Sequence, residues 1–200
     1  MIKLARGLSW IPIWIALTST AHAESGAKTV HFLVVPKLLA TRSYSSTIDD
    51  ALNQIGASGH FGFGYDLGIF WNIGPELALG ASMTAAIDKY SKTNALAPGS
   101  VATLQPAISL LYSPSDTFGK GALFRADLGP AFLLYPASPF TPSGILQPTA
   151  SSTGLGAQLT AGYGIPLSDT LRLVLSFSYQ IAAGSAAQAR YTTAGLGFMF

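Results

Sequence analysis

Cysteine is absent from this chain of 200 residues. Small exported domains often rely on disulfide bonds, because a small hydrophobic core alone gives them little stability. If this chain is exported, its stability must come from another source. A closed β-barrel in a lipid bilayer has such a source, since every strand is paired and the outer face lies in hydrocarbon.

Charge is also scarce in the sequence. Charged residues make up 10% of the chain, whereas hydrophobic residues make up 49%. Eleven Lys and Arg residues, less Lys3 and Arg6 of the N-terminal segment, leave nine basic residues against nine acidic ones. We therefore expect no basic surface of the kind that binds nucleic acid.

Hydrophobic runs long enough for a membrane-spanning helix are missing beyond the N-terminus. The N-terminal run, residues 9–17, is too short to cross a bilayer as a helix. Lys3 and Arg6 precede it and the small residues Ala21 and Ala23 follow it, which is the pattern of a secretory signal peptide. We predict a signal peptide over residues 1–23 and a mature domain over residues 24–200.

Alternation of apolar and mostly polar side chains is the main pattern of the remaining sequence. From Leu171 to Ile181 every second residue is apolar or aromatic, so a strand there would have one apolar face. Similar segments predict an all-β protein of eight strands. They lie at about 29–40, 58–71, 76–88, 101–112, 121–135, 153–166, 170–182 and 189–200. A soluble periplasmic barrel or sandwich is the alternative fold.

The predicted connections alternate in length. Residues 72–75, 113–120 and 167–169 are short turns, whereas residues 41–57, 89–100 and 136–152 are long loops. This alternation is typical of bacterial outer-membrane barrels, with short turns on the periplasmic side and long loops outside. Both chain ends then lie on the periplasmic side, and the short connection at 184–188 is an exception.

Aromatic residues and prolines give two further expectations. Aromatic side chains near both ends of the strands predict two girdles at the membrane interfaces. The expected members are Trp71, Tyr112, Phe124, Tyr163 and Phe198 on the periplasmic side, and Phe61, Tyr135 and Tyr179 on the outer side. Pro36, Pro106 and Pro130 fall inside predicted strands, where we expect bulges or early strand ends because proline cannot donate to a ladder.

The C-terminal segment carries a more specific pattern. Thr192, Ala194, Leu196, Phe198 and Phe200 share one face of the last predicted strand. This strand resembles the terminal strand of the outer-membrane β-barrel superfamily, and the mature chain is similar to the small eight-stranded barrels of the OmpA/OmpX and OmpW kind. The resemblance implies a closed antiparallel up-and-down transmembrane barrel in a Gram-negative outer membrane. It also implies contacts with outer-membrane lipid and lipopolysaccharide, and an assembly signal, Phe198 and Phe200, read by the barrel-assembly machinery.

The predicted interior of the barrel contains charged residues. Parity places five of them inward: Lys37, Asp66, Arg125, Asp127 and Arg172. Because unpaired charges are costly to bury, we expect a paired polar network that closes the lumen, with a gate or polar path as the other interpretation. Inward-facing glycines either make room for arginines across the lumen or leave a narrow cavity for water or a slender ligand.

These patterns favour a structural or surface-interaction role through the long loops. Residues 136–152 are a mobile coat or a contact site, with Phe140, Ile145 and Leu146 as contact candidates. The alternative is a narrow channel or carrier for small molecules, including hydrophobic ones. A third hypothesis is a lipid A-modifying enzyme that uses His60 with Asp49 or Asp50. We expect no enzyme activity because no base–nucleophile pair is recognisable, and we expect no metal or cofactor.

Overall fold

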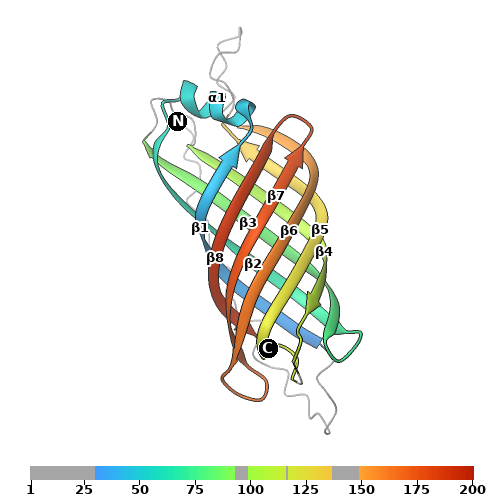
Figure 1. Ribbon diagram of the computed structural model, residues 1–200. Coiled ribbons are helices and arrows are strands. Elements are labelled where there is room, and N and C mark those ends of the chain that lie inside the picture. Colours follow the sequence, from blue (N-terminus) through green and yellow to red (C-terminus); the bar gives the residue numbers. More distant parts are fainter. Residues whose placement is uncertain (1–29, 93–98, 116, 137–148) are drawn as a thin grey trace, which may run out of the picture.

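The computed structural model describes residues 30–92, 99–115, 117–136 and 149–200. Within these ranges the chain forms eight strands and one helix. The strands are β1 (Val30–Tyr44), β2 (Ser58–Asn72), β3 (Leu77–Lys92), β4 (Ser100–Tyr112), β5 (Gly121–Tyr135), β6 (Ala150–Pro166), β7 (Arg172–Gly184) and β8 (Gln188–Met199). Each strand pairs antiparallel with its sequence neighbour and β8 pairs with β1, so the sheet is a closed up-and-down barrel (Figure 1). The predicted fold class and number of strands are confirmed.

Apolar side chains cover the outside of the barrel. Burial alternates along most of the sheet, as in β2, where the odd positions from Phe61 to Trp71 are exposed and the even positions are buried. The exposed positions include phenylalanines, leucines and tyrosines from all eight strands. Such a surface is unstable in water and suits hydrocarbon, as expected for a transmembrane barrel. Within the described ranges, no helix is long and apolar enough to cross a membrane.

No bulge or strand end lies at any of the three prolines, so that prediction was wrong, although the β1–β8 ladder has a register shift nearby, between Leu39 and Thr41. Pro36, Pro106 and Pro130 each pair with one neighbouring strand, opposite Tyr65, Met83 and Leu155 respectively. On the other side of each proline the ladder is interrupted without a change of register. A proline lacks an N–H on one side only, so the strand continues and loses bonds locally.

A short helix replaces part of the long loop predicted at residues 41–57. β1 continues to Tyr44, and α1 (Ser46–Gln54) lies across one end of the barrel, here called the helix end (Figure 1). Ile48 and Leu52 of α1, and Ile55 directly after it, are buried against the barrel. Their spacing of four and three residues puts them on one helix face, which the polar composition of the segment concealed. Gly56, with φ of 61°, follows the helix and ends it.

The interior of the barrel has three layers. At the helix end, α1 packs on an outer core that includes Val101, Leu133 and Tyr191. At the opposite end, here called the turn end, an inner core joins residues from seven strands and the β4–β5 turn. Its members are Leu33, Val35, Phe70, Ala78, Leu111, Phe118, Leu123, Val174 and Met199. Buried polar residues lie between the two cores and are described below.

One residue near the barrel ends, Tyr135, differs from its predicted place. Tyr135 was expected in the outer aromatic girdle, but its side chain points inward and belongs to the outer core.

His31 lies at the turn end, and its ring stacks on Phe118 with centroids 4.7 Å apart. Phe118 comes from the predicted short turn at 113–120, so this turn folds inward and covers the inner core rather than projecting away.

The inward glycines make room mainly for side chains other than arginine. A Cβ at Gly68 or Gly80 would overlap the ring of Phe70, and one at Gly62 would overlap Leu39. A Cβ at Gly156 would meet the Gln105 amide, 2.5 Å from its Oε1. At these glycines the expected arginine partners are therefore replaced by apolar and amide groups.

Candidate functional site

The centre of the lumen contains a buried cluster of charges around Asp66. Lys37 Nζ and Arg125 Nη2 each lie 2.5 Å from Asp66 Oδ2. Thr84 donates a hydrogen bond of 2.6 Å to the other carboxylate oxygen, Oδ1. The three charged side chains are all nearly inaccessible to solvent. Asp66 is thus bound by two cations and one hydroxyl, as a buried carboxylate requires.

A second carboxylate completes the balance of charge. Arg125 Nε donates to Asp127 Oδ2 at 2.8 Å, so one guanidinium bridges the two aspartates. Gln158 Nε2 lies 3.1 Å from Asp127 Oδ2 and 3.2 Å from Asp66 Oδ2. Two cations and two anions leave the cluster with no net charge. Since both carboxylates are occupied by cations and donors, neither is placed to act as a general base.

Hydroxyl and amide side chains extend this cluster across the lumen; together they are called the polar belt. Lys37 donates to Ser178 Oγ at 3.0 Å, Ser82 donates to Asp127 Oδ1 at 3.2 Å, and Gln180 donates to Gln105 Oε1 at 2.9 Å. The polar belt consists of Lys37, Asp66, Ser82, Thr84, Gln105, Ser109, Arg125, Asp127, Gln158, Thr160, Ser178 and Gln180. These residues come from seven strands, so the belt ties opposite walls together.

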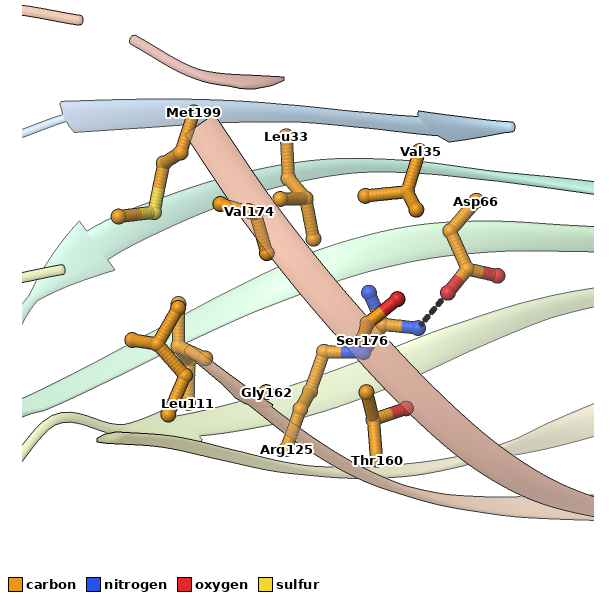
Figure 2. Close-up of a pocket in the computed structure, with 11 residues that line it drawn as sticks. Leu33, Val35, Asp66, Leu111, Arg125, Thr160, Gly162, Val174, Ser176 and Met199 are labelled. Carbon is orange, nitrogen blue, oxygen red and sulfur yellow. Dashed lines mark hydrogen bonds and ion pairs between the residues drawn. The ribbon is translucent and has the colours of Figure 1, made fainter. Parts of the chain in front are cut away.

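A small cavity lies between the polar belt and the inner core. Its volume is about 20 Å³, which is room for about one water molecule. Figure 2 shows Asp66, Arg125 and Thr160 on its polar side, and Leu33, Leu111 and Met199 on its apolar side. A cavity of this size, closed by apolar side chains, provides no continuous passage for a solute.

Four of the five charged residues predicted for the lumen lie together, and Arg172 does not. Arg172 is buried at the start of β7, where it pairs with Met199 of β8 near the turn end. An odd or even position in a strand predicts whether a side chain faces the lumen, but not how far along the barrel axis it lies. For this reason the sequence grouped Arg172 with the other four. Sequence reasoning also missed Gln158 and Thr84, although both occupy inward positions of predicted strands.

A third buried carboxylate, Asp88, lies at the helix end. Arg42 Nε is 2.9 Å from Asp88 Oδ2, and the Tyr44 hydroxyl donates to the same oxygen at 2.8 Å. His60 Nδ1 lies 3.4 Å from Asp88 Oδ1, and its side chain is half exposed. The structure therefore pairs His60 with Asp88 and not with Asp49 or Asp50. The Arg42 guanidinium also stacks over the ring of Tyr90, 5.2 Å from its centroid.

The remaining predictions concern the loop contact candidates, the signal peptide, the assembly signal and metal binding. The loop candidates Phe140, Ile145 and Leu146, and the predicted signal peptide, lie outside the described residues. Phe198 is exposed on the outer face of β8, and the backbone of Phe200 exchanges two hydrogen bonds with Phe32. In the described part of the chain, no three histidine, aspartate or glutamate side chains gather where they could hold a metal ion.

Comparison with known proteins identifies the fold. No protein-family model matches the sequence, and no curated protein is significantly similar to it. Among solved structures, Neisserial surface protein A matches with a TM-score of 0.58 and 14% identity, over 87% of this chain and 97% of that one. Ail, the attachment invasion locus protein of Yersinia pestis, in complex with the heparin analogue sucrose octasulfate, matches with a TM-score of 0.53 and 10% identity, over 86% and 97%.

These likenesses confirm the resemblance predicted from the sequence. The fold is that of the small eight-stranded outer-membrane β-barrels.

Proposed function

We propose that this protein is a non-catalytic barrel of the bacterial outer membrane that acts at the cell surface through its helix end. The observation that carries the proposal is the filled lumen. The outer core, the polar belt and the inner core follow one another along the barrel, and each is made of buried side chains. A barrel filled in this way is a rigid support, and loops on a rigid support commonly carry binding functions.

The distribution of apolar side chains on the surface of the barrel gives further support. The outer face of the strands is apolar, so contact with partners falls to the ends of the barrel, where α1 and the strand connections lie. Ail, of the same fold, has been solved with a heparin analogue. Residues 137–148, with Phe140, Ile145 and Leu146, are part of the proposed surface for a partner or for lipopolysaccharide.

We propose that residues 1–23 direct export and are removed, and that Phe198 and Phe200 are the signal for the barrel-assembly machinery. Outward-facing Phe198, and Phe200 with its backbone bonded to Phe32 of β1, are the supporting features. Changing Phe200 to serine should lower the amount of barrel in the outer membrane while leaving refolding into lipid vesicles unchanged. Equal loss in both assays would make Phe200 a general stability residue and contradict the signal.

The proposed role is tested by conductance and binding together. The purified barrel in planar bilayers should give no sustained single-channel steps, because the polar belt and both cores block the lumen. Cells that display the barrel should bind host cells or matrix more than cells without it, and deletion of residues 137–148 should lower this binding. Sustained conductance with unchanged binding would favour the channel or carrier instead.

A further inference from the structure

A cavity of about 490 Å³ opens at the helix end, between α1 and the outer ends of β1 and β3. Its lining includes Arg42, Tyr44, Asp49, Asn53 and Tyr90. This volume falls within the range of small-molecule binding sites, about 300–1,000 Å³. The cavity is separate from the polar belt, because the outer core lies between them. It is formed where a helix folds over a barrel mouth, so it depends on α1.

Two of the polar groups around the cavity, Arg42 and Tyr44, are held in place by side-chain contacts, and two others, Asp49 and Asn53, are presented by α1. Asp49 and Asn53 are four residues apart, so they lie on one face of α1 one turn from each other. Arg42 is fixed by its bond to Asp88 and by the Tyr90 ring beneath it, and Tyr44 is fixed by its own hydrogen bond to Asp88. Groups fixed in this way bind a ligand with little loss of side-chain freedom.

The charge of the cavity argues against an anionic ligand. Arg42 is its one cation among the described lining residues, and Asp88 already neutralises it at 2.9 Å. Asp49, on α1, adds an exposed carboxylate to the lining. The local sum is therefore negative, so a sulfated or phosphorylated ligand would be repelled.

The hydrogen-bonding groups favour a ligand rich in hydroxyl groups. A guanidinium only donates, a carboxylate only accepts, and the Asn53 amide does both. Each hydroxyl of a ligand both donates and accepts, so neighbouring hydroxyls need donors and acceptors side by side. Arg42, Asp49 and Asn53 supply both kinds of group around one cavity.

We infer that this cavity binds a neutral, hydroxyl-rich ligand of the sugar class. The inference rests on the proposed surface role and names the kind of ligand that role would involve. The sugar comes either from outside the cell or from the oligosaccharide of lipopolysaccharide in the same membrane. Both sources offer the same chemistry to Arg42, Asp49 and Asn53.

The test uses the full mature chain in lipid nanodiscs and records backbone amide NMR shifts. Glucose, galactose, N-acetylglucosamine, lactose and chitobiose are added in turn, with sucrose octasulfate as the anionic comparison. At least one neutral sugar should shift the amides of Asn53 and Tyr90 in a saturable way, and the anion should not. Nanodiscs with lipopolysaccharide should already show these shifts if its oligosaccharide is the ligand, whereas nanodiscs with lipid A alone should not.

Matched variants on α1 locate the site. Asp49→Ala and Asn53→Ala should each weaken binding about tenfold, because each removes a polar partner of the ligand. Asp50→Ala is the control, since Asp50 is exposed, lies next to Asp49 and does not line the cavity. It should leave the affinity within about twofold. All three positions are exposed on the helix, so the variants should fold.

Several outcomes would overturn the inference. They are the absence of binding by every neutral saccharide, equal effects of Asp49→Ala and Asp50→Ala, or tighter binding of sucrose octasulfate at the same amides. The proposed surface role has separate tests, which are conductance and cell binding. If no sugar binds while cell binding persists, the sugar site fails and the surface role stands.

Discussion

Lys37 and Arg125 bind the same oxygen atom, Asp66 Oδ2, each at 2.5 Å, from opposite parts of the barrel wall. Lys37 belongs to β1 and Arg125 to β5, so a single carboxylate links the first strand to the fifth through the lumen. Two cations on one oxygen would repel each other without that carboxylate. Asp66 is therefore the residue on which the polar belt most depends.

Replacing Asp66 by asparagine should strongly destabilise the barrel. The change leaves Lys37 and Arg125 buried with Asp127 as the remaining anion, and of these two cations Asp127 pairs with Arg125 and not with Lys37. Removing one partner of a buried ion pair costs about 3–5 kcal/mol. The free energy of unfolding in detergent micelles, from urea titration with heat-modifiable gel migration, measures this loss.

The control for that experiment is Asp169→Asn, in the exposed β6–β7 turn. It should change the free energy of unfolding by less than about 0.5 kcal/mol. If Asp66→Asn also lowers the free energy of unfolding by less than about 1 kcal/mol, the bonds of Asp66 to Lys37 and Arg125 do not stabilise the barrel.

Gly68→Ala should destabilise the barrel by about 1–3 kcal/mol, through overpacking of the inner core. The new Cβ would lie 2.5 Å from Phe70 Cε2, and the fully buried ring cannot retreat because Gly80 holds it from the other side. Gly74→Ala is the matched control, since the nearest atom to its Cβ is Leu77 Cβ at 4.0 Å. Equal stability of both variants, measured by urea unfolding, would mean that the Phe70 ring is not confined.

Replacing residues 46–54 by a glycine-serine linker of equal length should not create a channel. The change removes α1 and part of the outer core, but the polar belt and the inner core still fill the lumen. Conductance in planar bilayers should stay at the level of the unchanged barrel. Stepwise currents from this variant would show instead that α1 is the main barrier, and that the helix works as a gate.

The double change Pro106→Val and Pro130→Val should restore missing bonds between β4 and β5. The ladder stops between Leu104–Phe132 and Ile108–Leu128 with the same register on both sides, and that register places Pro106 opposite Pro130. Each restored bond contributes about 0.5–1.5 kcal/mol, and each lost proline costs about 0.4–1 kcal/mol through the unfolded chain. The net gain is therefore small, at most about 2 kcal/mol.

Hydrogen exchange gives the sharper measurement of that double change. The amides introduced at positions 106 and 130 should exchange as slowly as the flanking amides of Leu104 and Ile108. Rapid exchange at both positions would mean that the two strands do not continue in register through this stretch.

Alternation along the sequence was enough to predict the barrel, because a strand in a membrane wall has a regular requirement at every second residue. The same parity put Lys37, Asp66, Arg125 and Asp127 in the lumen. The alternation could not predict that Asp66 and Arg125 would contact each other, because that contact depends on how far β2 and β5 are displaced from each other along the barrel axis. For the same reason Arg172 was grouped with them although it lies near the turn end.

The helix end could be predicted least well. Ile48, Leu52 and Ile55 have helical spacing, but the segment around them is polar and only nine residues form the helix. A helix this short is not stable by itself and forms because it buries its apolar face on the barrel. Its presence, and the cavity beside it, therefore depend on residues such as Tyr191 that are distant in sequence.

The N-terminal end of α1 is attached to the last strand. The Ser45 N–H donates to the Gln188 carbonyl at 2.9 Å, and the Gln188 N–H donates to Ser45 Oγ at 3.1 Å, across 143 residues of sequence. Synthesis begins at the N-terminus, so residues 45–54 exist long before β8 does. The helix therefore acquires this anchor only when β8 is in place, and the same strand that closes the sheet against β1 also holds the start of α1.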